Sequence, residues 1–145
     1  MATKIKFDER QIQIRGQVFF HGFITVVVLL LINAVLQDIG VVWASGFHQN
    51  ILILMLASTV VSTEAILRGA YFGKGESRRM VICVIGFPAI VLWAINFLHI
   101  FQGSAVLEDG TLTRDGFSLT LAAFFTMISV SGLIKIIMER REKNE

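Results

Sequence analysis

The most chemically unusual stretch of the sequence is a carboxylate followed by a cation near the end of a long apolar segment. Glu64 follows a run from Asn50 to Thr63 that carries no charge, and Arg68 comes four residues later. A carboxylate inside an apolar helix is costly unless it faces protein or water. The order of the two charges favours an ion pair along one helix face. The pair indicates a structural clamp, a site for a proton, an ion or a lipid headgroup, or a surface that recognises a partner.

Two further residues are expected to complete this site. Arg15 and His21 lie on the first predicted helix, which enters the membrane from the same side as the Glu64 end. We therefore predict one intramembrane polar cluster of Glu64, Arg68, Arg15 and His21. Of its alternative uses, the sequence favours a clamp that joins the first two apolar segments.

The other polar residues inside the apolar segments have small or neutral side chains. Residues of this kind form hydrogen bonds between membrane helices and let the helices approach closely. We predict such a packing role for Ser58, Thr59, Ser62, Thr63, Asn33, Asn96 and His99. Mostly Val, Leu, Ile and Phe separate the Glu64 end from the polar residues at the opposite end. This distribution argues against a permanent water-filled pore.

The sequence lacks the motifs of the common catalytic and metal sites. There is no HExxH, GxSxG, CxxC or Walker glycine loop, and the three histidines lie on different segments. Cys83 is the only cysteine, so an intrachain disulfide is excluded. We therefore predict a protein that is not an enzyme and that holds no metal and no cofactor.

The elements that position these residues must cross a membrane. The chain has 145 residues, of which 54% are hydrophobic and 17% charged, and its mean hydropathy is +0.70. Helices of about 20 residues span the hydrocarbon core and satisfy their own backbone hydrogen bonds there. Four stretches qualify, at residues 18–36, 50–67, 80–101 and 117–138. We predict an all-α integral membrane four-helix bundle with up-down topology, forming a single domain over residues 1–145.

The basic residues predict the orientation of these spans. All but one of the 13 Lys and Arg residues lie in the N-terminal segment, the second connection or the C-terminal end, and the exception is Arg114. Cytoplasmic flanks of membrane helices are enriched in basic residues. We therefore predict a multi-pass plasma-membrane protein with both termini in the cytoplasm. Because membrane orientation explains why the basic residues cluster, the lipid bilayer is the expected partner and nucleic acid is not.

Three local signals predict structure around the spans. Asp8 and the acid after it are typical of a helix N-terminus, so the first helix is expected to begin near Asp8. Asp109-Gly110 lies between alternating residues and predicts a tight hairpin turn. Pro88 removes a backbone hydrogen bond inside the third span and predicts a kink there.

Two short runs carry a resemblance to known proteins. Asp8-Glu9-Arg10-Gln11 with Ile14-Arg15-Gly16, together with Glu64-Ala65-Ile66-Leu67-Arg68-Gly69, resembles a group of uncharacterised small four-span membrane proteins of Gram-positive bacteria. The resemblance covers the first two spans best. It implies a bacterial plasma-membrane location and implies no activity or catalytic residue.

Two classes of function are favoured after these exclusions, ahead of a membrane enzyme that acts on lipid. The first is an accessory, regulatory or sensing subunit that acts through helix contacts and its cytoplasmic face, with a membrane-protein partner or a second copy of itself. The second is a small transporter or channel component, oligomeric in its working form, with Glu64 as its proton or ion site. Short connections and the absence of a charged residue at the middle of the spans favour the first class.

Overall fold

The chain forms four long helices, as the apolar stretches predict. The computed structural model describes residues 7–73 and 78–142, with the side chains of residues 78–81 left out. The helices are α1 (Glu9–Asp38), α2 (Gly46–Leu67), α3 (Arg78–Phe101) and α4 (Arg114–Glu142). All four are long and apolar enough to cross a membrane, so the prediction of an all-helical chain with four candidate spans is confirmed.

The first helix begins well before its apolar stretch because its N-terminus is capped. The backbone N–H of Gln11 donates to Oδ1 of Asp8 at 2.7 Å, and the backbone N–H of Asp8 donates to Oε1 of Gln11 at 3.2 Å. This reciprocal capping box satisfies two donors that a helix end otherwise leaves unpaired. The predicted start near Asp8 is confirmed. With its 30 residues, α1 is roughly 45 Å long and exceeds a hydrocarbon core of about 30 Å.

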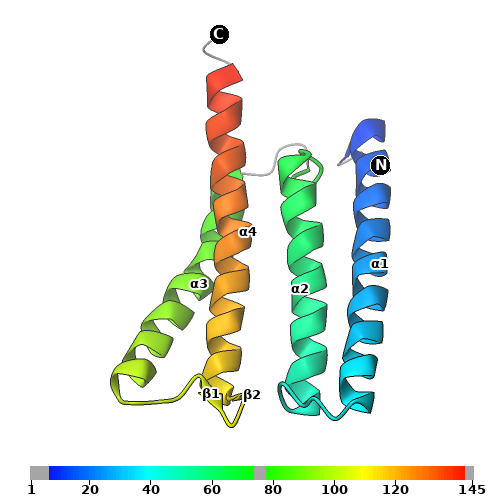
Figure 1. Cartoon of the computed structure of the whole chain (residues 1–145). Helices are drawn as coiled ribbons and strands as arrows, with labels where there is room; N and C mark the ends of the chain where they lie inside the picture. The colour runs from blue at the N-terminus through cyan, green and yellow to red at the C-terminus, as the bar shows by residue number, and fades with distance from the viewer. Residues whose placement is uncertain (1–6, 74–77, 143–145) are drawn as a thin grey trace, which may run out of the picture.

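The helices lie in a single row whose order differs from their order along the chain. The extensive helix contacts join α1 to α2, α2 to α4, and α4 to α3. Figure 1 shows this row as α1, α2, α4 and α3 from right to left, so α4 lies between α2 and α3. Each inner helix has two neighbours, whereas α1 and α3 form the edges. The row therefore leaves both of its faces and both edge helices available to lipid or to other molecules.

A short hairpin lies between α3 and α4 along the chain, at the lower end of Figure 1. Strands β1 (Leu107–Glu108) and β2 (Thr111–Leu112) pair in antiparallel register. Asp109 and Gly110 both have positive φ angles, 49° and 78°, as a two-residue hairpin turn requires. The predicted Asp-Gly turn is therefore confirmed. The backbone N–H of Leu112 also donates to the carbonyl of Trp43 at 2.8 Å, so the hairpin joins the α1–α2 connection to the start of α4.

Glycines allow close contact at both edges of the row. A Cβ on Gly22 of α1 would clash with the Val61 side chain of α2, and one on Gly132 of α4 would lie 2.7 Å from Ile82 of α3. Small residues are a common means of close helix approach in membranes. A buried apolar cluster joins the end of α2 and the loop after it to the start of α3 and the middle of α4, and consists of Ile66, Phe72, Ile82 and Ile128.

The third helix continues through Pro88 as one unbroken helix. Figure 1 shows its lower part leaning away from α4. Large side chains on this edge are widely exposed, among them Phe97 at 69% and Phe101 at 85%. A local kink at Pro88 stays a prediction.

Candidate functional site

Four side chains from α1 and α2 meet around Glu64. Nδ1 of His21 lies 2.9 and 3.0 Å from the two Glu64 carboxylate oxygens. Nη1 of Arg68 donates to Oε1 of Glu64 at 2.9 Å, and Nη2 donates to Oε1 of Gln17 at 2.7 Å. We call Gln17, His21, Glu64 and Arg68 the Glu64 cluster. It joins α1 to α2 through two side chains from each helix.

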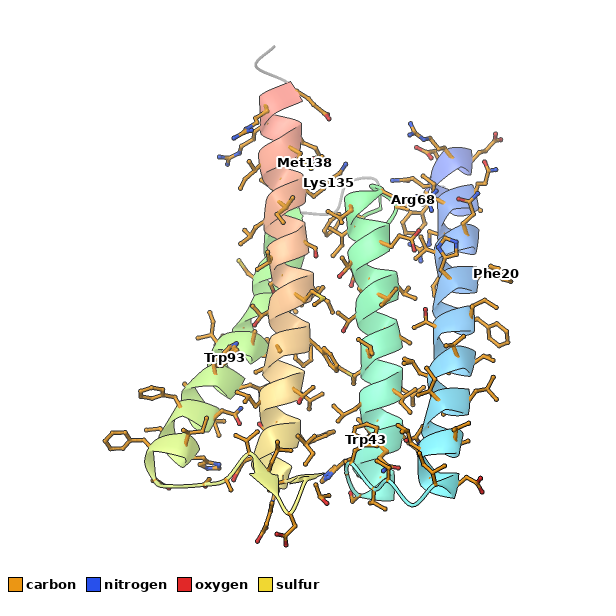
Figure 2. All side chains as sticks on the ribbon, in the orientation of Figure 1. Phe20, Trp43, Arg68, Trp93, Lys135 and Met138 are labelled. Atoms are coloured by element: carbon orange, nitrogen blue, oxygen red, sulfur yellow. The ribbon has the colours of Figure 1, made fainter. Side chains whose placement is uncertain are left out.

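Helical spacing explains why these four residues face one another. Glu64 and Arg68 are four residues apart, as are Gln17 and His21, so each pair lies on one helix face. The two faces oppose each other across the α1–α2 contact. Figure 2 shows Arg68 at the upper end of α2, on the side of α1.

The Glu64 cluster lies on the surface of the row. The side chains of Glu64, Arg68 and His21 are 25%, 38% and 53% exposed. When Glu64 is ionised, its oxygens only accept hydrogen bonds, and Nδ1 of His21 is then the donor in their contact. Both carboxylate oxygens are thereby occupied, and the Arg68 charge balances that of Glu64. This arrangement can hold α1 against α2.

Arg15 lies on another face of α1, away from the partners that the sequence interpretation assigns to it. Its Nη1 donates to the backbone carbonyl of Ala70 at 3.3 Å, and its guanidinium carbon lies 4.2 Å from the centre of the Phe7 ring. The structure thus brings together Glu64, Arg68 and His21 and places Arg15 elsewhere. Gln17 is the cluster member that the sequence interpretation missed.

The loop after α2 is a second connection between the first two helices. Nε2 of Gln11 donates to the carbonyls of Gly69 and Phe72 at 3.0 and 3.3 Å. Gly69 has a φ of +73°, and the backbone N–H of Ala70 donates back to the carbonyl of Ala65 at 2.8 Å. Glycine at this position lets the helix end in a left-handed turn that satisfies its last carbonyls. The loop can then fold back toward the start of α1.

The small polar residues of α2 point in two directions. Thr59 is fully buried and donates to the Met55 carbonyl of its own helix at 2.8 Å. Thr63 accepts a long hydrogen bond of 3.5 Å from Ser131 of α4. Ser58 and Ser62 instead line a groove between α1 and α2, of about 670 Å³, that also includes Arg15. Within the described part of the chain, Thr63 alone among the four forms a hydrogen bond to another helix.

The remaining polar residues join elements near the hairpin end of the row. Asn96 is buried and donates to Oγ of Ser118 at 3.0 Å, as expected of a contact between helices. Nδ1 of His99 lies 2.7 Å from Oδ1 of Asp115, also between α3 and α4. Asn33 accepts from Nε1 of Trp43 at 2.8 Å, so it holds the connecting loop rather than a neighbouring helix.

No candidate metal centre is found in the part of the chain that the structure describes, since no three His, Cys, Asp or Glu side chains gather there. Comparisons of the chain with protein-family models, with curated proteins and with solved structures found no match. The site must therefore be interpreted from its own geometry.

Proposed function

We propose that this chain is a non-enzymatic membrane protein that acts as an accessory, regulatory or sensing subunit. It lies in a bacterial plasma membrane with up-down topology and both termini in the cytoplasm. The four apolar helices and the one-sided basic residues support this placement. The working surfaces are the edge helices and the cytoplasmic face, and the partner is another membrane protein or a second copy of this chain.

The open row is the observation that carries this proposal. Helices α1 and α3 each pack extensively against one neighbour, although both have the length and apolarity of a membrane span. Their outward side chains are large and exposed, as Phe20 of α1 illustrates in Figure 2. Edge helices of this kind can pack against a further helix within the bilayer. The Glu64 cluster also supports a structural role, because both carboxylate oxygens already have partners.

Purification from native membranes tests the proposal. The full chain carries an affinity tag, and a photo-crosslinking residue replaces Phe97 on the α3 edge, Phe20 on the α1 edge, or Ile53, which is buried within the row, as a control. We expect a stoichiometric complex and crosslinks from at least one edge position, with none from Ile53. A chain that purifies alone, without edge crosslinks to any protein, would contradict the proposal. Labelling at Asp109 from outside the cell, with both termini protected, checks the orientation.

A transporter or channel component remains the alternative because His21 contacts Glu64 directly. Carboxylates and histidines in contact form proton relays in membrane pumps and transporters, so the pair has the chemistry of a proton site. Proton, sodium and potassium flux into liposomes that contain the purified protein tests this alternative. Flux above that of empty liposomes, lost in Glu64→Gln, would favour the transporter over the accessory subunit.

A further inference from the structure

The groove between α1 and α2 is amphiphilic along its length. Arg15 and Tyr71 line one end, beside the ring of Phe7. The rest of the wall is mainly apolar, with contributions from Val18, Gly22, Val26, Leu54, Ala57 and Val61. It holds about 670 Å³, within the range of roughly 300 to 1,000 Å³ typical of ligand pockets. We call this surface the α1–α2 groove. Its polarity matches a molecule with one charged end and a hydrocarbon tail.

The length of the groove matches one leaflet of a bilayer. On α1 it extends from Arg15 to Val26, and on α2 from Leu54 to Ala65. At 1.5 Å per residue, each of these helical segments is about 16 Å long. Half of a hydrocarbon core of about 30 Å has nearly the same thickness. Arg15 therefore lies at headgroup level when the opposite end of the groove lies near the bilayer midplane.

The charge at the polar end is available to an anion. Arg15 donates one hydrogen bond of 3.3 Å to a backbone carbonyl, and none of the carboxylates among the described side chains pairs with it. A guanidinium has five N–H donors, so most of them can still bind a phosphate. Arg68, on the other face of the α1–α2 pair, differs because Glu64 already neutralises it.

We propose that the α1–α2 groove binds one acyl chain of an anionic phospholipid, whose phosphate contacts the Arg15 guanidinium. Free phosphate would leave the apolar length of the groove without an occupant, and an uncharged lipid would leave Arg15 without a counter-charge. The proposal depends on the placement of the four helices across a membrane. It does not depend on the accessory function or on any protein partner.

Lipid binding to the purified full chain tests the headgroup contact. Delipidated protein in detergent is titrated with phosphatidylglycerol or with phosphatidylcholine of the same acyl chains, and native mass spectrometry measures the bound fraction. One Arg near the membrane surface predicts about fivefold tighter binding of phosphatidylglycerol. We expect Arg15→Gln to abolish this preference and Arg15→Lys to keep it. Arg10→Gln is the matched control, because Arg10 lies outside the groove lining.

A second pair of variants tests the acyl-chain contact. Ser58→Phe fills the groove from an exposed position, whereas Val60→Phe adds the same ring outside the groove lining. We expect Ser58→Phe to reduce phosphatidylglycerol binding at least fivefold and Val60→Phe to leave it unchanged. Equal binding of the two phospholipids, or equal binding by Arg15→Gln and the unmodified chain, would overturn the proposal. Displacement of the lipid by millimolar inorganic phosphate, or equally tight binding of diacylglycerol, would also overturn it.

Discussion

The two edges of the row are attached to its centre by different combinations of contacts. At one edge, α1 is joined to α2 by the charged side chains of the Glu64 cluster. At the other edge, two neutral hydrogen bonds join α3 to α4, from Trp93 to Thr126 and from Asn96 to Ser118, and His99 contacts the Asp115 carboxylate beside the hairpin. The Glu64 cluster lies near the upper helix ends of Figure 1, while these α3–α4 contacts lie toward the lower end of α3.

The difference follows from the surroundings of each contact. Charged groups are tolerated near the ends of membrane helices, where water and headgroups reach them, and neutral groups are less costly at depth. Removing one partner of an ion pair costs more stability than removing one partner of a neutral hydrogen bond, because the remaining charge is left without compensation. The α1 edge should therefore depend on charge, whereas the α3 edge should depend on charge only at the contact of His99 with Asp115 and on neutral contacts elsewhere.

The largest expected effect is steric and is common to both edges. Gly22→Leu and Gly132→Leu each place a side chain where a Cβ alone already meets the opposing helix. Overpacking of this kind predicts a loss of about 3 kcal/mol in the free energy of unfolding in detergent. Gly16→Leu is the control, because nothing lies within 4 Å of its added Cβ. Unchanged stability at Gly22 and Gly132 would contradict the close helix approach.

Local patterns predicted the elements of the fold but could not predict their arrangement. The lengths of the apolar stretches predicted the four helices. Asp109-Gly110 predicted the turn, because few other residue pairs adopt positive φ angles at both positions. The position of α4 between α2 and α3 depends on how side chains fit across helices. A contact such as that of Gly132 with Ile82 cannot be predicted from the hydropathy of the segments or from the lengths of the loops between them.

Part of the Glu64 cluster could be predicted from the spacing of its residues along the helices. Glu64 and Arg68 were predicted because their spacing places both on one face. Arg15 precedes His21 by six residues, which turns it about 120° away around the helix, while Gln17 precedes His21 by four. The same arithmetic would therefore have favoured Gln17 over Arg15. The contact of Arg15 with Ala70 depends on the path of a loop, which residue spacing does not give.

The second prediction tests the charge dependence of the α1 edge. Glu64→Gln keeps the shape of the side chain but leaves Arg68 without its counter-charge. We expect a loss of about 2 kcal/mol, typical of a hydrogen-bonded charged group, because partial exposure reduces the penalty of a fully buried pair. The thermal midpoint in detergent measures the loss. Arg15→Gln, which removes a charge outside the Glu64 cluster, should change the midpoint much less. Equal losses would place Arg15 in the same clamp.

The smallest effect is expected at the neutral contact of the α3 edge. Asn96→Leu keeps the approximate volume of the side chain and removes its hydrogen bond to Ser118. Hydrogen bonds between membrane helices contribute on average about 0.6 kcal/mol in double-mutant cycles. A cycle of Asn96→Leu, Ser118→Ala and the double variant should therefore give a coupling energy near this value. The matching cycle of Glu64→Gln and His21→Ala should give a larger coupling, because its contact includes an ionised group. A coupling at Asn96 as large as that at Glu64 would mean that charge does not distinguish these two contacts.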